Sequence, residues 1–360
     1  MSIVSKILCK DVLSKDDIIF LLQTNVDDRN KLYEKAAEIK SEYVGKKVFF
    51  RGLIEMSNIC RKGCFYCGIR AGNANIKRYN LSDEEVIDAA VFAWKNQYAS
   101  LAIQTGEVEG ETFTIRISEL LKKIHKKTNG ELGITLSMGE QSEDTYKEWF
   151  ESGAIRYLLR IEASNRELYS KLHPKNKAHD YDRRVDCLKV LRKVGYQVGT
   201  GVMIGLPFQT IENLADDLLW IKSIDIDMVG MGPYIEHPDT PLYSLKDNLI
   251  PLDERFNLTL KMIAILRILM KDINIAAPTA LQAIDKLGRE KGLMVGANVV
   301  MPNITPGIYR NDYKLYDNKP CVDDAVDDCK NCLEARIQLT GDSIGYGEHG
   351  NSKHFIKRCS

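Results

Sequence analysis

Eight short apolar runs that alternate with segments of helical periodicity limit the fold of this 360-residue chain. The runs are rich in β-branched residues, which favours strands, and most of the segments between them repeat apolar residues at helical spacing. They lie at residues 48–56, 100–105, 133–137, 156–161, 197–204, 227–233, 274–279 and 293–301. Strands that alternate with helices form parallel sheets, and eight such units over about 250 residues predict an α/β fold, a closed (β/α)8 TIM barrel.

An open, doubly wound sheet is the structural alternative, because it uses the same alternation of strands and helices. The first apolar run is not followed by a G-x-G-x-x-G sequence, so nothing indicates a dinucleotide-binding sheet in particular. The connection between the last two runs, residues 281–292, is the weakest of the predicted helices, with barely two turns.

Two flanking segments lie outside the predicted barrel, which covers residues 46–302. Residues 1–45 form an N-terminal extension of amphipathic helices, one of which is expected to begin at Ser14 with Asp16 and Asp17 in its first turn. Residues 303–360 form a C-terminal extension that closes the barrel and carries a group of cysteines.

Fifty Lys and Arg residues balance fifty Asp and Glu residues, so the chain has no net charge. A neutral chain lacks the basic field that attracts nucleic acids or anionic membranes, and we expect neither as a partner. No apolar run approaches the roughly 18 residues of a membrane span. The first ten residues do not have the pattern of a signal peptide, and a cytoplasmic location is expected.

Nine cysteines are the unusual element of the composition. An odd number in a chain expected to be cytoplasmic argues against a disulfide framework. Six of them form two triplets, Cys60, Cys64 and Cys67 with spacing C-x3-C-x2-C, and Cys321, Cys329 and Cys332 with spacing C-x7-C-x2-C. The first spacing arises by chance only about 0.006 times in such a chain. Neither triplet has the nearby fourth Cys or His that structural zinc requires, so an iron–sulfur cluster with one open iron is favoured.

The first triplet directly follows the first predicted strand, at the C-terminal face where barrel active sites lie. Its three thiolates can hold three irons of a 4Fe-4S cluster and leave the fourth iron free for a substrate or cofactor. The neighbouring cations Arg61 and Lys62 favour the thiolate forms. Tyr66 either packs under the loop or offers its ring to an adenine.

The signature C-x3-C-x-aromatic-C is formed by Cys60, Cys64, Tyr66 and Cys67. This signature and its place after the first strand resemble the radical S-adenosylmethionine (SAM) superfamily. The resemblance implies that SAM binds the open iron and that one electron from the cluster breaks its S–C5′ bond, giving methionine and a 5′-deoxyadenosyl radical. A low-potential electron donor such as ferredoxin or flavodoxin is then expected.

Residues at the ends of the following strands, or close after them, match SAM-binding positions of that superfamily. They are Gln104, Thr105, Gly106, Glu107, Ser137, Glu162 and Arg184. Glu107 suits the SAM amino group, Glu162 the ribose hydroxyls and Arg184 the SAM carboxylate. Each alone also fits an ordinary loop residue or a salt bridge at the barrel rim, but their place on successive strand ends favours a SAM site.

Longer segments resemble a narrower group in the biotin synthase and methylornithine synthase branch, the FeFe-hydrogenase maturases of the HydE type. These segments are residues 54–78, 136–140, 156–162, 205–207, 227–242 and 296–310. The resemblance implies an enclosed, positively charged cavity in which the radical attacks the sulfur of a cysteine bound to an iron complex that carries CO and cyanide. It also implies other hydrogenase maturases as partners in H-cluster assembly.

The substrate-cavity positions that this resemblance implies are Arg160, Met228, Thr279, Tyr313 and Tyr316. Three residues depart from the pattern of some relatives: Ile161 and Ala163 replace a His and a Thr beside the glutamate, and Pro278 replaces one of two threonines. These departures affect the expected anion-binding cavity more than the SAM chemistry.

The second triplet, Cys321, Cys329 and Cys332, matches the spacing of an auxiliary iron–sulfur site in some members. Its acidic neighbours predict an exposed, labile 2Fe-2S or 4Fe-4S cluster, with zinc as the alternative. Cys187 and Cys9 are predicted to lie in helix cores. The six histidines show no metal-binding spacing.

Two other functions stay open at this point. One is a radical SAM enzyme that acts on an amino acid, such as methylornithine synthase. The other is an iron–sulfur electron-transfer or scaffold protein, which predicts no turnover of SAM.

Overall fold

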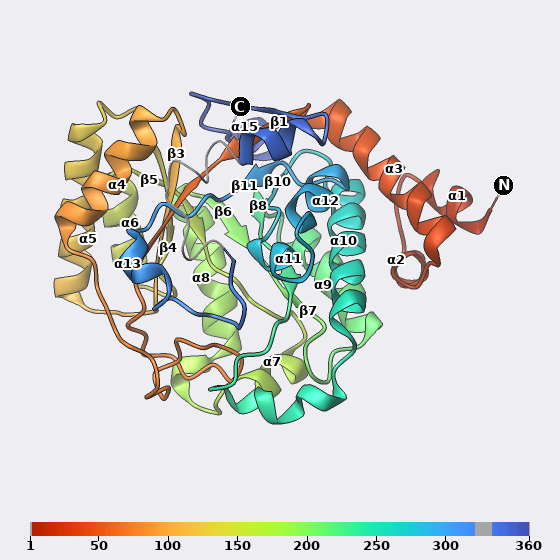
Figure 1. Ribbon diagram of the computed structural model, residues 1–360, viewed down its shortest axis with the longest axis horizontal. Helices are drawn as coiled ribbons and strands as arrows, with labels where there is room; N and C mark the ends of the chain where they lie inside the picture. Colours follow the sequence, from red (N-terminus) through yellow and green to blue (C-terminus); the bar gives the residue numbers. More distant parts are fainter. Residues whose placement is uncertain (1, 321–332, 360) are drawn as a thin grey trace.

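The computed structural model describes residues 2–320 and 333–359, which form a ring of parallel strands surrounded by helices (Figure 1). Seven strands make one parallel sheet in the order β10-β8-β6-β5-β4-β3-β2. They are β2 (Gly52–Ser57), β3 (Ser100–Thr105), β4 (Gly133–Ser137), β5 (Ala154–Leu158), β6 (Gln197–Thr200), β8 (Met228–Val229) and β10 (Asn274–Ile275). The order in space follows the order along the chain, as in a barrel built from successive strand–helix units.

An eighth strand closes the sheet into a ring. β11 (Val299–Val300) pairs in parallel with β1 (Lys47–Phe50), which leads into β2 through Arg51 alone. On its other side, Val299 bridges in parallel to Ala276, the residue after β10. β11 therefore lies between the two edges of the seven-stranded sheet, and the predicted barrel is confirmed.

The predicted apolar runs agree with the strands to different degrees. β3 and β4 have the predicted limits. The runs at 197–204 and 227–233 are each divided, because β7 (Met203–Ile204) and β9 (Gly232–Pro233) follow β6 and β8 after a break and pair with each other. Irregular backbone therefore lies at the C-terminal ends of these strands, where ligands bind in barrels.

The prediction is wrong at the ends of the last two runs. Thr279 lies in α11 (Thr279–Ile284) and Leu293 in α12 (Gly288–Met294), not in strands. The physical reason is that a short buried apolar run reads the same in a helix and in a strand.

Helices cover the outside of the barrel. Ser82 accepts the N–H of Glu85, and the Glu85 carboxylate accepts the N–H of Ser82, so that a capping box starts the first of them. This first helix is α4 (Asp83–Lys95). The remaining helices of this layer and of the C-terminal part are α5 (Glu111–Lys127), α6 (Glu143–Glu151), α7 (Arg166–Leu172), α8 (Tyr181–Val194), α9 (Ile211–Ser223), α10 (Leu252–Leu269), α13 (Gly307–Arg310) and α15 (Lys353–Cys359).

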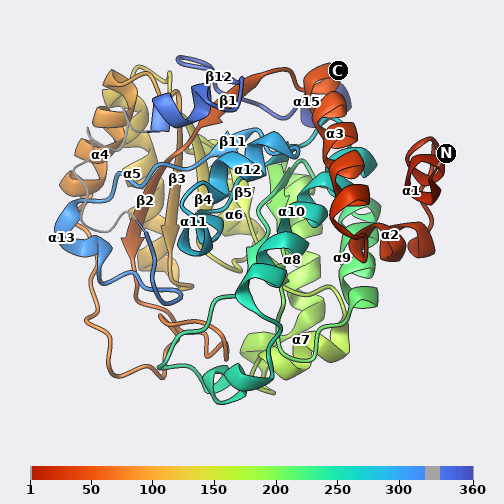
Figure 2. The same ribbon diagram turned by 45° about the vertical axis from the view of Figure 1, so that its right-hand side comes forward.

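Three N-terminal helices pack outside the barrel beside α9 and α10 (Figure 2). They are α1 (Ile3–Leu8), α2 (Lys15–Leu22) and α3 (Val26–Tyr43). Ser14 caps α2 as predicted. Cys9 is exposed at the end of α1, so its predicted place in a helix core is wrong, because the short α1 buries only Val4 and Ile7.

C-terminal residues close the end of the barrel at which the strands begin, at the top of Figure 1. β12 (Ser343–Ile344) pairs with β1. The buried guanidinium of Arg156 donates to the His349 carbonyl at 2.7 Å, and the Asn274 amide donates to the Gly350 carbonyl at 2.8 Å. These contacts leave the opposite end, where the strands end, for a functional site.

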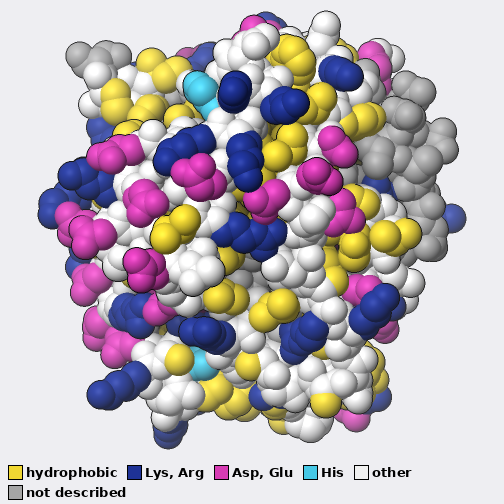
Figure 3. All heavy atoms as spheres, turned by 90° about the vertical axis from the view of Figure 1, so that its left-hand side faces the viewer, with side chains coloured by type: hydrophobic (Ala, Val, Ile, Leu, Met, Phe, Trp, Pro, Cys, Tyr) yellow, Lys and Arg dark blue, Asp and Glu magenta, His cyan; other side chains and the backbone are white. Residues whose placement is uncertain are grey.

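Charged side chains of both signs are mixed over the face shown in Figure 3, in keeping with the balanced composition. In the part of the chain that the structure describes, no helix combines the length and the apolar character that crossing a membrane requires.

Candidate active site

The loop between β2 and α4 carries the first cysteine triplet at the end of the barrel where the strands end, at the lower left of Figure 1. The Cys60 Sγ atom accepts the backbone N–H groups of Lys62 at 3.4 Å and Glu107 at 3.3 Å. Burial is the main cause of a raised pKa for all three thiols, and the pKa of Cys64 rises to about 12. The charges of neighbouring cysteines also raise the pKa values of Cys64 and Cys67. Burial in this loop therefore favours the protonated thiols over the thiolates.

Arg78 holds this loop in shape. Its guanidinium donates to the backbone carbonyls of Asn58 at 2.6 Å, Ile69 at 2.8 Å, Arg70 at 2.6 Å and Asn73 at 3.2 Å. One side chain thus fixes backbone on both sides of the cysteines. The sequence alone does not predict this role of Arg78, because an arginine in a loop carries no signal of its own.

The turn after β3 packs directly on the cysteine loop, as its position on the neighbouring strand predicts. Gly106 donates its N–H to the Ser57 carbonyl at 2.8 Å, and the Glu107 carbonyl accepts the N–H of Arg61 at 2.9 Å. A Cβ at position 106 would lie 2.3 Å from the Ile59 carbonyl oxygen, so only glycine fits this contact. The turn and the loop form one unit.

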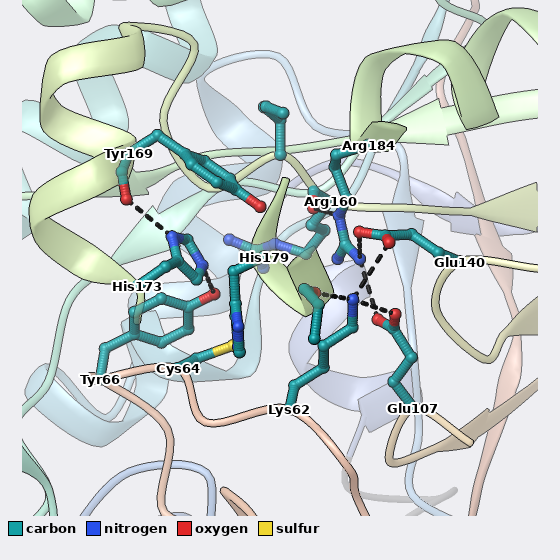
Figure 4. A pocket seen from close by; sticks show the side chains of 12 residues that line it. Lys62, Cys64, Tyr66, Glu107, Glu140, Arg160, Tyr169, His173, His179 and Arg184 are labelled. Carbon is teal, nitrogen blue, oxygen red and sulfur yellow. Dashed lines mark hydrogen bonds and ion pairs between the residues drawn. The ribbon is translucent and has the colours of Figure 1, made fainter. Parts of the chain in front are cut away.

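Four charged side chains, of which three are buried and Arg184 is half-buried, form a closed ring of ion pairs in the pocket beside Cys64 (Figure 4). Lys62 Nζ lies 2.8 Å from Glu107 Oε1 and 3.0 Å from Glu140 Oε2. Arg184 Nη1 lies 2.9 Å from Glu107 Oε2 and 3.0 Å from Glu140 Oε1. Burial opposes the ionisation of Glu107, but Arg184 and Lys62 hold its pKa below the usual value.

Glu140 is a member of this ring that the sequence analysis missed. It is 1% exposed and contacts Lys62 and Arg184. A signal was present, because Glu140 follows the end of β4 by three residues and strand ends meet at one face of a barrel.

Two histidines and two tyrosines line the other side of the pocket (Figure 4). His173 Nε2 accepts the Tyr66 hydroxyl at 3.1 Å, and its Nδ1–H donates to the Tyr169 carbonyl at 2.8 Å. His179 Nε2 accepts the N–H of Gly63 at 3.0 Å. Burial lowers the pKa of His173 to about 3 and of His179 to about 4, so both rings are neutral. These histidines support the cysteine loop, a role that their sequence spacing does not reveal.

Glu162 lies just beyond β5 in a left-handed backbone conformation, with a φ angle of +66°. Its carboxylate lies 2.9 Å from Arg160 Nη2, and Arg184 donates to the Arg160 carbonyl at 3.0 Å. Burial is the main cause of the raised pKa of Tyr66. The charges of Cys64 and, to a smaller extent, Glu162 raise this pKa further. The structure therefore brings Glu107, Arg184 and Tyr66 to the lining of one pocket, and Glu162 pairs with Arg160 of the same lining.

The residues at the ends of β3 and β4 face the barrel interior or its wall. Gln104 pairs in register with Ser137, the last residue of β4. The Gln104 amide donates to the hydroxyl of the buried Tyr313 at 2.9 Å. Thr105 is buried, and its hydroxyl has no hydrogen-bond partner among the described residues.

The predicted substrate-cavity residues are spread over several places. Arg160 lines the Cys64 pocket. Met228 lies in β8 and accepts a hydrogen bond from Arg51 at 2.9 Å on its sulfur. Thr279 lines a second cavity together with Lys319 and Asn303. Tyr316 is partly exposed. The structure brings Arg160 alone of these residues to the lining of the Cys64 pocket.

The three residues that depart from the pattern of some relatives lie in different places. Ile161 lines the Cys64 pocket, Ala163 is buried, and Pro278 precedes α11. Cys187 is buried in α8, as predicted. The second triplet, Cys321, Cys329 and Cys332, lies outside the described residues.

The cysteine loop fits an iron–sulfur cluster. Cys60 Sγ accepts two backbone N–H groups, which is how proteins support cluster sulfurs. Within residues 2–320 and 333–359, no group of three or more His, Cys, Asp or Glu side chains is arranged to hold a metal ion. In a 4Fe-4S cluster each thiolate binds its own iron.

Comparisons with known proteins agree with this geometry. The family model "Radical SAM superfamily" matches residues 54–221. The [FeFe] hydrogenase maturase subunit HydE of Thermotoga maritima is 43% identical over 334 residues, which cover 92% of this chain and 92% of that protein. The chain belongs to the radical SAM superfamily.

Other radical SAM proteins are similar over most of their length. A 3-methylornithine synthase of Methanosarcina acetivorans is 29% identical over 80% of this chain and 79% of its own. The crystal structure of a methylornithine synthase has a TM-score of 0.78 at 24% identity and covers 96% of this chain and 98% of its own. The FeFe-hydrogenase maturase HydG from Carboxydothermus hydrogenoformans has a TM-score of 0.80 at 18% identity, with coverages of 98% and 82%. These structures confirm the radical SAM barrel, and membership of the superfamily means that the chain is an enzyme that uses a 4Fe-4S cluster and SAM.

Proposed function

We propose that this radical SAM enzyme is a maturase for FeFe hydrogenases, which acts on a cysteine-bound Fe(CO)2(CN) precursor in assembly of the diiron subcluster of the H-cluster. The observation that carries the proposal is the 43% identity to a HydE subunit over 92% of both chains. The matched 334 residues are more than the predicted barrel contains.

We assign Cys60, Cys64 and Cys67 as the ligands of three irons. Their loop is fixed by Arg78 and by the turn at Gly106, so the thiol positions are set before a cluster binds. When bound, the cluster and SAM supply the one-electron cleavage that gives methionine and a 5′-deoxyadenosyl radical.

The other pocket residues bind and orient SAM in this proposal. Glu107 accepts hydrogen bonds from the ammonium, and Arg184 faces the carboxylate. Glu162 accepts the ribose hydroxyls, and Tyr66, which His173 holds by its hydroxyl, places its ring against the adenine. Residues with supporting positions at the strand ends are Gln104, Thr105, Gly106 and Ser137.

The barrel interior beyond this pocket is proposed to hold the iron complex. The residues assigned to it are Arg160, Met228, Thr279, Tyr313 and Tyr316. We propose residues 46–302 as the catalytic barrel, with residues 1–45 and 303–360 as supporting extensions.

The proposal includes three further elements. Cys321, Cys329 and Cys332 form an auxiliary 2Fe-2S or 4Fe-4S site that SAM cleavage does not require. A ferredoxin or flavodoxin supplies the electron, and the other hydrogenase maturases supply and receive the iron complex. Reduced cysteine ligands and this electron donor fit a cytoplasmic location.

SAM cleavage is tested by anaerobic reconstitution with iron and sulfide, reduction with dithionite, and chromatography for 5′-deoxyadenosine. We expect cleavage by the wild-type enzyme, none by the Cys64→Ala variant, and nearly normal cleavage by the matched Cys329→Ala variant. No cleavage by a protein whose first cluster is verified by spectroscopy would show an electron-transfer or scaffold protein instead. Complete dependence on Cys329 would refute the assignment of the second triplet.

The maturase role needs a separate test. An inactive FeFe hydrogenase is incubated with the other maturases and with this protein, and hydrogen production is measured. We expect activation only when this protein is present with an intact Cys64. Failure to activate, together with conversion of an amino acid to methylornithine, would instead assign the methylornithine synthase reaction.

A further inference from the structure

The ε-ammonium group of Lys62 occupies a site that is complete for a primary ammonium ion. Its Nζ lies 2.8 Å from Glu107 Oε1 and 3.0 Å from Glu140 Oε2, and it also donates to the Ala178 carbonyl. An ammonium has three N–H donors, and here each finds one oxygen acceptor. The side chain of Lys62 is 11% exposed, and that of Glu140 1%, so this is a desolvated binding site and not a surface ion pair.

The same site is where the proposed function places the SAM ammonium. Glu107, which receives Lys62, lies on the turn that packs against the cysteine loop and donates its N–H to Cys60 Sγ at 3.3 Å. The second cation of the ring, Arg184, is held by the Arg160 carbonyl at 3.0 Å and remains in place to face the SAM carboxylate. Lys62 Nζ fills the position between the two carboxylates and the Ala178 carbonyl, so a second ammonium cannot take that position while Lys62 is there.

We propose that Lys62 is an internal substitute for the SAM ammonium, which leaves Glu107 and Glu140 when SAM binds and returns when the site empties. This inference rests on the proposed SAM site. Exchange of one ammonium for another leaves the charge around Glu107 and Glu140 unchanged, with Arg184 and, 3.4 Å from Glu140, Arg183 still in place.

Lys62 is suited to such movement by its place in the chain. It lies between Cys60 and Cys64 on a loop, and a flexible four-carbon stem carries its ammonium. Its release therefore requires side-chain rotation and no movement of the cysteines. An arginine with its planar, five-donor group would not be an equivalent substitute for a primary ammonium.

Chemical labelling of lysines tests the exchange on the wild-type, cluster-loaded protein. The protein is pulsed anaerobically with an amine-acylating reagent, and modification of Lys62 is measured by mass spectrometry relative to Lys177, an exposed lysine beside the pocket. If SAM raises the released fraction of Lys62 from about a tenth to nearly all, its labelling rises about tenfold. 5′-Methylthioadenosine, which lacks the amino-acid part of SAM, should leave the labelling unchanged.

Labelling that SAM leaves unchanged or lowers would overturn the inference, as would an equal rise with 5′-methylthioadenosine. SAM binding is verified separately by the change it causes in the electron paramagnetic resonance spectrum of the reduced cluster. Absence of that change contradicts the proposed function. A spectral change without release of Lys62 contradicts this inference alone.

A pair of variants gives an independent measurement. Lys62→Met removes the internal competitor, so the dissociation constant of SAM should fall about tenfold if Lys62 occupies the site nine-tenths of the time. Lys177→Met is the matched control, since it removes a nearby exposed lysine, and should leave SAM affinity unchanged. Equal or weaker SAM binding by a folded Lys62→Met variant would contradict the exchange.

Discussion

Replacing Gly106 with alanine tests whether the turn after β3 and the cysteine loop act as one unit. The added Cβ would lie 2.3 Å from the Ile59 carbonyl oxygen and 2.7 Å from the Cys60 Cβ. Both atoms belong to the backbone or are bonded to it directly, so no side-chain rotation relieves the overlap. The cysteine loop has to move away from the turn.

The size of the effect follows from the contacts that this movement breaks. Gly106 N–H to the Ser57 carbonyl and Arg61 N–H to the Glu107 carbonyl are both lost. Two hydrogen bonds contribute about 1–3 kcal/mol together, and overpacking a tight contact costs about 1–3 kcal/mol. The free energy of unfolding of the cluster-free protein should therefore fall by roughly 2–6 kcal/mol in Gly106→Ala.

The assay is urea unfolding of the cluster-free protein, followed by circular dichroism, with the iron content measured after reconstitution. Gly307→Ala is the control, because a Cβ there meets no atom within 4 Å. We expect low iron content in Gly106→Ala and wild-type behaviour in the control. A Gly106→Ala variant within about 0.5 kcal/mol of the wild type and with full iron content would refute the reasoning.

Three further predictions concern groups outside the cysteine loop or at its base. Burial raises the pKa of Asp217 to about 7, although hydrogen bonds from Ser164 oppose the shift. The native state therefore loses stability as the pH rises from about 4 to about 7. Asp217→Asn should gain stability relative to the wild type over that range, as measured by unfolding at both pH values. Lys40→Met breaks a buried ion pair with Asp342, whose N–O distance is 2.6 Å. It should lower the free energy of unfolding by about 3–5 kcal/mol in a denaturant titration. Arg78→Lys loses the contacts to four loop carbonyls and should lower the iron content after reconstitution, whereas an unchanged content would show that the loop is held by other means.

The local sequence determined the barrel and the place of its reactive end. Period-two and period-3.6 patterns are properties of neighbouring residues, so they predicted β3 and β4 with their observed limits. The cysteine spacing is equally local, because one loop carries all three thiols. The rule that parallel strand ends meet at one face then predicted that Glu107 lies near the cysteines, as its N–H contact to Cys60 Sγ shows.

Only the tertiary structure decided which side chains complete the pocket. Glu140 and His173 come from different strand–helix units, and they reach the cysteine loop because the sheet curls into a ring. Their roles depend on the direction and burial of each side chain, as the ion pair of Glu140 with Lys62 and the hydrogen bond of His173 to Tyr66 show. Sequence spacing does not encode these quantities, because contacts between distant segments are fixed by the packing of the whole barrel.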